Sequence, residues 1–158
     1  MKEAAKSLEE NTYPVGAVIA DESGNVIATG RNHVNPLQDI TAHAEIDALR
    51  NAGKSILDAK LRKEKLTLYT TLEPCPMCTG AILFAHIHRV VWILNDETGF
   101  GGFRVIQESK VYESRFAKIE TIAEPFDDLK EIQLELMDSW SKNPYNIANQ
   151  RKAGVSLR

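Results

Sequence analysis

The sequence has little cysteine, no surplus of positive charge and no long apolar run. Its 158 residues include two cysteines and 19 Lys and Arg against 22 Asp and Glu, for a formal net charge of -3. This charge balance argues against a protein whose main role is to bind nucleic acid, although a local basic patch would not be visible in the net charge. Because no stretch of roughly 18 or more apolar residues is present, no membrane-spanning helix is predicted. We therefore expect a small, diffusible substrate and no membrane partner.

The start of the chain and the cysteine usage both indicate a reducing compartment. Residues 1–11 are charged and lack the apolar core of a secretion signal, so the protein is expected to be cytoplasmic. Cys75 and Cys78 are the only cysteines, and they have C-x-x-C spacing. In a reducing compartment such a pair indicates metal binding or redox chemistry before it indicates a structural disulfide.

Apolar runs and turn residues predict strands that alternate with helices in the second half of the chain. Strands are expected over 15–20, 26–29, 66–71, 89–94 and 117–123, and helices over 2–10, 42–51, 76–88, 105–116 and 127–140. Thr41 is the expected N-cap of the second helix, and Gly53 is expected to close it. The interval before the last strand is long enough for a crossover helix, which would make the last two strands parallel.

This pattern predicts an α/β layered fold with one domain over residues 1–158. The core of that domain is expected at about 13–125, followed by a C-terminal helix and tail at 126–158. The tail from Asn143 onward is polar, and we expect it to fray or to pack on the active site.

His43, Cys75 and Cys78 supply three metal ligands of the kinds that zinc prefers. None of the other histidines (His33, His86, His88) lies at ligand spacing. Three protein ligands leave one position for water, which is typical of a catalytic zinc site, whereas a structural site has four. We therefore predict one zinc ion per chain.

Glu45 is the carboxylate next to this site. Zinc with two thiolates and a neutral imidazole has no net charge, so it should acidify water less than zinc held by three histidines. A base is then needed to take the proton, and later an acid to return it. Two positions separate Glu45 from His43, which on a helix directs the two side chains roughly 200° apart. Glu45 is thus expected to miss the metal and to flank its water; the alternative is a solvent-exposed helix carboxylate.

Other interpretations of these motifs stay open at this stage. Cys75 and Cys78 are also compatible with a dithiol redox centre or with a zinc-binding module that lacks catalysis. Asn32 is either a turn residue or a residue that contacts the substrate base. Four aromatic residues belong either to the core or to a pocket wall. They are Phe100, Phe103, Trp140 and Tyr145.

The order H-x-E followed by P-C-x-x-C resembles the cytidine/deoxycytidylate deaminase superfamily. The resemblance extends from residue 14 to about residue 92, roughly half of the chain, and its two metal-site motifs (41–45 and 73–78) are specific. It implies a three-layer α/β/α fold with a five-stranded mixed sheet, and a protein that is usually an oligomer, here expected to be a homodimer. The resemblance also implies roles for particular residues: zinc binding by His43, Cys75 and Cys78, proton transfer by Glu45, and substrate contacts by Asn32 and the backbone N–H of Ala44.

Three branches of the superfamily share these motifs: guanine deaminase, tRNA adenosine deaminase and fungal-type cytosine deaminase. Residues 95–103 are acidic and then apolar, whereas the tRNA enzymes typically carry a basic, small-residue stretch there. This difference argues against docking of an RNA backbone. The expected function is therefore hydrolytic deamination of a free base or nucleoside, with a guanine-type purine ahead of cytosine. The alternative is a tRNA-specific adenosine deaminase.

Overall fold

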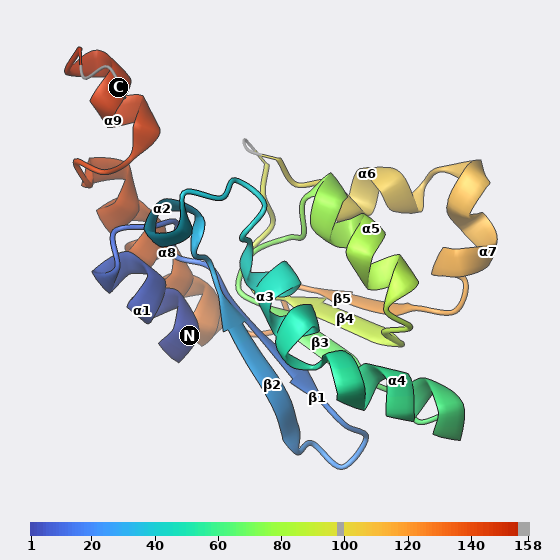
Figure 1. Cartoon of the computed structure of the whole chain (residues 1–158). Helices are drawn as coiled ribbons and strands as arrows, with labels where there is room; N and C mark the ends of the chain where they lie inside the picture. Colours follow the sequence, from blue (N-terminus) through green and yellow to red (C-terminus); the bar gives the residue numbers. More distant parts are fainter. Residues whose placement is uncertain (98–99, 155–158) are drawn as a thin grey trace.

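The computed structural model describes residues 1–97 and 100–154 and contains a five-stranded mixed sheet (Figure 1). The strands are Gly16–Ala20 (β1), Val26–Arg31 (β2), Thr67–Thr70 (β3), Arg89–Trp92 (β4) and Glu120–Ala123 (β5). Their order in the sheet is β2-β1-β3-β4-β5. β1 is antiparallel to β2 and β3, while β3, β4 and β5 are mutually parallel neighbours. All five predicted strands are present, and the predicted parallel crossover into β5 is confirmed.

Helices lie on both sides of this sheet (Figure 1). They are Lys2–Glu9 (α1), Val34–Leu37 (α2), Ala44–Asn51 (α3), Gly53–Arg62 (α4), Pro76–Phe84 (α5), Phe103–Gln107 (α6), Lys110–Tyr112 (η1, a 3-10 turn), Glu113–Phe116 (α7), Asp127–Lys142 (α8) and Ile147–Lys152 (α9). The three-layer α/β/α prediction is confirmed. Among the described residues, no helix combines the length and apolarity that a bilayer crossing requires.

Two details of the second predicted helix are wrong. Its N-cap is His43 rather than Thr41, because the Thr41 hydroxyl is used in the preceding turn, where it donates to Asp39 Oδ1 at 2.7 Å. Gly53 does not close the helix but begins α4, since its backbone is outside the left-handed region that ends helices at glycine.

Two other helices differ in length from the predictions. α5 ends at Phe84 and not near His88, because His86 adopts a left-handed backbone (φ 57°) that turns the chain into β4. The helix expected over 105–116 is divided into α6, η1 and α7, with an extended residue, Ser109, at the first break.

The hydrophobic core lies around the central parallel strands. Leu68 on β3 and Val90 and Trp92 on β4 are fully buried. The indole of Trp92 packs against Phe103, with ring centroids 5.2 Å apart. This anchors α6 beneath the loop that follows β4, so the carboxyl ends of β3 and β4 are held against the N-terminus of α5.

Candidate metal centre and its cavity

Two helix N-termini meet at the predicted metal site. His43 is the N-cap of α3 and Cys75 is the N-cap of α5, with Pro76 in the first helical position. Cys78 lies in the first turn of α5. The positive dipole ends of both helices favour thiolates at this point.

The spacing of the three side chains fits a tetrahedral zinc ion. His43 Nδ1 lies 3.6 Å from Cys75 Sγ and 3.7 Å from Cys78 Sγ, and the three ligand atoms are within 4.8 Å of one another. A tetrahedral zinc with Zn–N of about 2.05 Å and Zn–S of about 2.3 Å separates nitrogen from sulfur by about 3.6 Å. Among the described residues, no other group of three potential ligands comes this close.

Protonation of the two thiols is coupled. A hydrogen bond from the Cys78 thiol lowers the pKa of Cys75 to about 4, and the same bond, together with burial, raises the pKa of Cys78. The pKa of His43 is raised, mainly by its hydrogen bond to Cys75. Both sulfurs would bind a dication as thiolates, so metal binding would displace the proton from Cys78.

Glu45 is buried, with 3 % of its surface exposed, so it is not the solvent-exposed helix carboxylate considered as an alternative. Its Oε1 accepts a hydrogen bond from Thr70 Oγ1 at 3.0 Å. Burial raises the pKa of Glu45 because it disfavours the charged carboxylate. The side chain is thus held in one orientation from β3, in surroundings that ease proton uptake.

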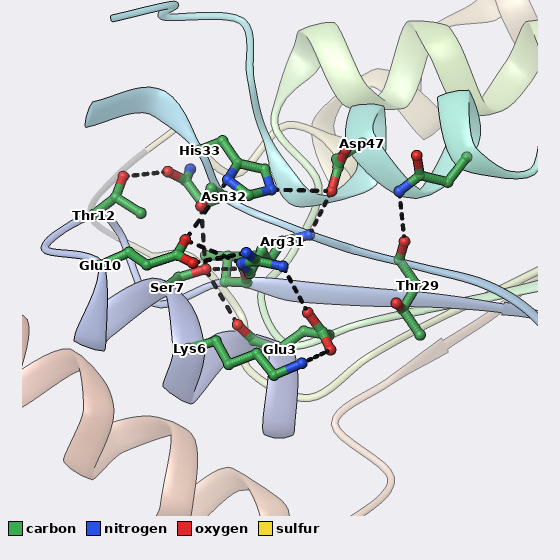
Figure 2. A network of polar contacts seen from close by, with 12 residues as sticks. Glu3, Lys6, Ser7, Glu10, Thr12, Thr29, Arg31, Asn32, His33 and Asp47 are labelled. Carbon is green, nitrogen blue, oxygen red and sulfur yellow. Dashed lines mark hydrogen bonds and ion pairs between the residues drawn. The ribbon is translucent and has the colours of Figure 1, made fainter. Parts of the chain in front are cut away.

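A cavity of about 330 Å³ brings the predicted site residues together. Five of the six line it, and the sixth, Cys78, is fully buried. The five are Asn32, His43, Ala44, Glu45 and Cys75. The Asn32 carboxamide reaches this cavity from just beyond β2 and is fixed by a polar network (Figure 2).

Sequence reasoning missed several residues of the cavity wall. Thr12 and Tyr13 come from the segment after α1, and Asn146 and Ile147 come from the C-terminal tail. The described part of the tail therefore packs on the site, one of the two outcomes expected for it, while residues 155–158 lie outside the described residues. No local signal marks these residues, because their sequence positions are more than a hundred residues apart.

The four aromatic candidates divide between cavity and core. Phe100 and Trp140 line the cavity, whereas Phe103 is buried in the core and Tyr145 lines a separate surface hollow. Trp140 packs edge-on against Tyr13 with ring centroids 5.9 Å apart. Burial and the charge of Asp96 raise the pKa of Tyr13 to about 12, which keeps this wall of the cavity uncharged.

Glu73 fastens the loop after β4 to the metal site. Its carboxylate accepts hydrogen bonds from Asp96 N at 3.3 Å, Arg104 N at 3.1 Å and Arg104 Nε at 3.0 Å. A Cβ on Gly101 would come within 2.9 Å of Glu73 Oε2 and within 2.5 Å of the Asp96 carbonyl oxygen, so the loop packs closely here. Glu73 immediately precedes the P-C-x-x-C motif. Its position in the sequence could therefore have identified it as a residue close to the metal site.

Comparison with known proteins assigns this chain to a protein family. The family model described as "Cytidine and deoxycytidylate deaminase zinc-binding region" matches residues 1–94, which is more than half of the chain and includes all three ligands. The chain belongs to this family. Deaminases of the family are hydrolases of C–N bonds, and their metal region binds zinc, which favours the zinc site over a dithiol redox centre.

Individual relatives differ in substrate. The tRNA-specific adenosine deaminase of Haemophilus influenzae is 47% identical over 105 residues, covering 66% of this chain and 58% of that protein. A solved tRNA:A34 deaminase structure is 36% identical with a TM-score of 0.58, covering 77% of this chain and 91% of that one. The guanine deaminase of Nitrosomonas europaea has a TM-score of 0.72 at 22% identity, covering 89% of this chain and 80% of that one, which shows the shared fold alone.

The curated relatives support the tRNA alternative better than the free-base function expected from the sequence. The chain nevertheless spans less than two thirds of the Haemophilus enzyme, and the family match ends at residue 94. The family match therefore does not cover the loop after β4 or the C-terminal tail, both of which contribute residues to the cavity.

Proposed function

We propose that this chain is a zinc-dependent hydrolytic deaminase of an amino-substituted nucleobase. The observation that carries the proposal is the triangle of His43, Cys75 and Cys78 beside the buried carboxylate of Glu45 in one cavity. A structural zinc site would have a fourth protein ligand, whereas this cluster has three among residues 1–97 and 100–154 and opens onto a cavity.

His43, Cys75 and Cys78 would hold the zinc ion, which would lower the pKa of a water molecule at its open position. Glu45 accepts one proton from that water and delivers it to the ring nitrogen while the water oxygen bonds to the ring carbon. Glu45 then carries the remaining proton of the added hydroxyl group to the amine, so that the C–N bond breaks and ammonia leaves. Thr70 donates to one carboxylate oxygen of Glu45 and thereby orients the carboxyl group for this transfer. The products are the oxo base and ammonia.

Asn32 and Ala44 are proposed to orient the base. Ala44 is the first residue of α3, and the N–H groups of a first helical turn have no partner inside the helix. Both residues line the cavity beside the metal ligands. The base is thereby offered hydrogen-bond donors from two directions.

Adenosine in tRNA is the substrate that the relatives favour. A tRNA adenosine deaminase is 47% identical over the shared region, and a tRNA:A34 deaminase structure is 36% identical and matched over 91% of its length. We accordingly place a wobble-position adenosine first among the substrates to be tested.

A free base or nucleoside is the second candidate, and the cavity itself favours it. Glu45, Glu73 and Asp96 line the cavity, and no Lys or Arg is among the described residues that do so. The described part of the lining therefore offers no Lys or Arg side chain that would bind an anionic phosphate, whereas a neutral base needs none. Trp140 and Ile147 also supply an apolar wall of the kind that covers a small ring.

Ammonia release from the zinc-loaded protein separates these candidates. The panel contains guanine, adenine, cytosine, their nucleosides, deoxycytidylate and a tRNA anticodon stem-loop with adenosine at position 34. Turnover of the stem-loop alone supports the first candidate, and turnover of a free base or nucleoside supports the second. Release from none of them would contradict the proposed function.

A further inference from the structure

Asn32 is held by the N-terminal segment of the chain as well as by its own strand. Its backbone N donates to Val15 O at 3.0 Å, and its carbonyl oxygen accepts from Ser7 Oγ at 3.3 Å. Ser7 and Thr12, which Figure 2 draws beside Asn32, are both buried. The side chain of Asn32 is buried with them, with 4 % of the residue exposed.

Two donors converge on one atom of the Asn32 carboxamide. Thr12 Oγ1 lies 2.6 Å from Asn32 Oδ1, and Val34 N donates to the same oxygen at 3.1 Å. Asn35 N in turn donates to Thr12 Oγ1 at 3.3 Å. A backbone N–H can only donate, so the single hydroxyl proton of Thr12 is directed to Asn32. The atom that receives both bonds must be the carboxamide oxygen and not its nitrogen.

We propose that Thr12 is a positioning residue that fixes the orientation of the Asn32 carboxamide, so that Nδ2 donates to a lone pair on the substrate ring. This inference rests on the proposed function, in which Asn32 contacts the base. It adds a requirement on the substrate: the ring must present a hydrogen-bond acceptor, a ring nitrogen or a carbonyl oxygen, on the side facing Asn32.

Loss of the Thr12 hydroxyl removes one of the two bonds that define this orientation. The remaining Val34 N–H still disfavours a flipped Asn32 carboxamide. In the flipped orientation the Val34 N–H would face the Asn32 NH2 group, and two donors cannot form a hydrogen bond. The expected effect is therefore the loss of one buried hydrogen bond, a decrease in kcat/KM of about 3- to 10-fold.

The test compares three variants on the substrate identified by the panel. Thr12→Val removes the hydroxyl at nearly constant shape, and Thr12→Ser restores it. Thr121→Val is the matched control, since the buried Thr121 hydroxyl on β5 has no hydrogen-bond partner within the described part of the chain. We expect a reduced kcat/KM for Thr12→Val only. If Thr12→Val does not fold, Thr12→Ala replaces it in every comparison.

A double-mutant cycle distinguishes positioning from a general structural role. In an Asn32→Ala background, Thr12→Val should cause no further loss of kcat/KM, because its effect acts through Asn32. Additive losses would overturn the inference. An unchanged kcat/KM in Asn32→Ala alone would instead contradict the proposed contact between Asn32 and the base.

A readout without turnover keeps the two proposals separable. The side-chain NH2 signals of Asn32 are assigned in 1H–15N spectra by their absence in Asn32→Ala. We expect Thr12→Val to shift these signals and to speed their exchange with solvent, while Thr12→Ser and Thr121→Val leave them in place. Unchanged signals in Thr12→Val would refute the positioning role even if no panel compound is deaminated.

Discussion

At the residue scale, Glu45 is a buried carboxyl group held by the Thr70 hydroxyl. Its neighbours are the three metal ligands and the Thr70 hydroxyl, and burial is the largest cause of its raised pKa. Burial of a carboxyl group costs free energy unless the group exchanges protons or is otherwise compensated. A role in proton transfer explains why this position carries an acid and not an apolar residue.

Replacement of Glu45 by glutamine should therefore abolish catalysis without releasing the metal. Glutamine keeps the shape and the bond from Thr70 but cannot accept a proton, so kcat should decrease by a factor of about 100 to 10,000. Ammonia release measures the rate, and metal analysis measures zinc per chain. Glu135→Gln, on the exposed face of α8, is the control and should leave both values unchanged. Retained turnover in Glu45→Gln would exclude the acid/base role.

At the element scale, α3 reaches its position by direct contact with the backbone of β2. A Cβ on Gly30 would collide with the backbone of Ala44 and Ala48, so only glycine allows this approach. The contact matters for the site because the first turn of α3 carries His43, Ala44 and Glu45. Displacement of the helix would therefore move a metal ligand and the proposed acid/base together.

Gly30→Ala should accordingly destabilise the fold. We expect the free energy of unfolding to fall by about 1–3 kcal/mol, the usual cost of overpacking against rigid backbone. Gly53→Ala is the matched control, because a Cβ on Gly53 meets nothing within 4 Å and its backbone is helical. That variant should gain about 0.4–1 kcal/mol through the unfolded state. Urea unfolding measures both changes, and equal midpoints for the two variants would contradict the packing argument.

At the scale of the whole molecule, a zinc ion would tie two helices of one layer to each other. His43 begins α3 and Cys75 begins α5, so the metal joins segments more than thirty residues apart in the chain. Metal that binds only the folded state stabilises it in proportion to the logarithm of metal concentration over Kd.

Removal of zinc by a chelator should lower the thermal midpoint by roughly 10 °C. This follows from about 4 kcal/mol of stabilisation at a thousandfold excess over Kd, with each kcal/mol worth about 2–4 °C for a chain of this size. Scanning calorimetry before and after zinc is restored measures the shift. Cys75→Ala serves as the control and should not respond to the chelator; an equal response in this variant would show that the effect does not arise from this site.

Two predictions about the whole molecule are tested neither by the fold nor by the comparison with relatives. The homodimer implied by the resemblance stays a prediction, and so does the assignment of residues 1–158 to one domain. Sedimentation of the zinc-loaded protein measures the first, and limited proteolysis followed by mass analysis measures the second.

The sequence by itself determined the metal chemistry, because His43, Cys75, Cys78 and Glu45 lie in two short motifs whose spacing is set by local helix geometry. It also determined the strands and their crossover, since apolar runs and turn residues act over a few neighbours. Only the tertiary structure decided the rest of the cavity. Thr12 and Trp140 both line it although they are 128 positions apart in the sequence. This follows from the packing of α8 against α1, which no local pattern encodes.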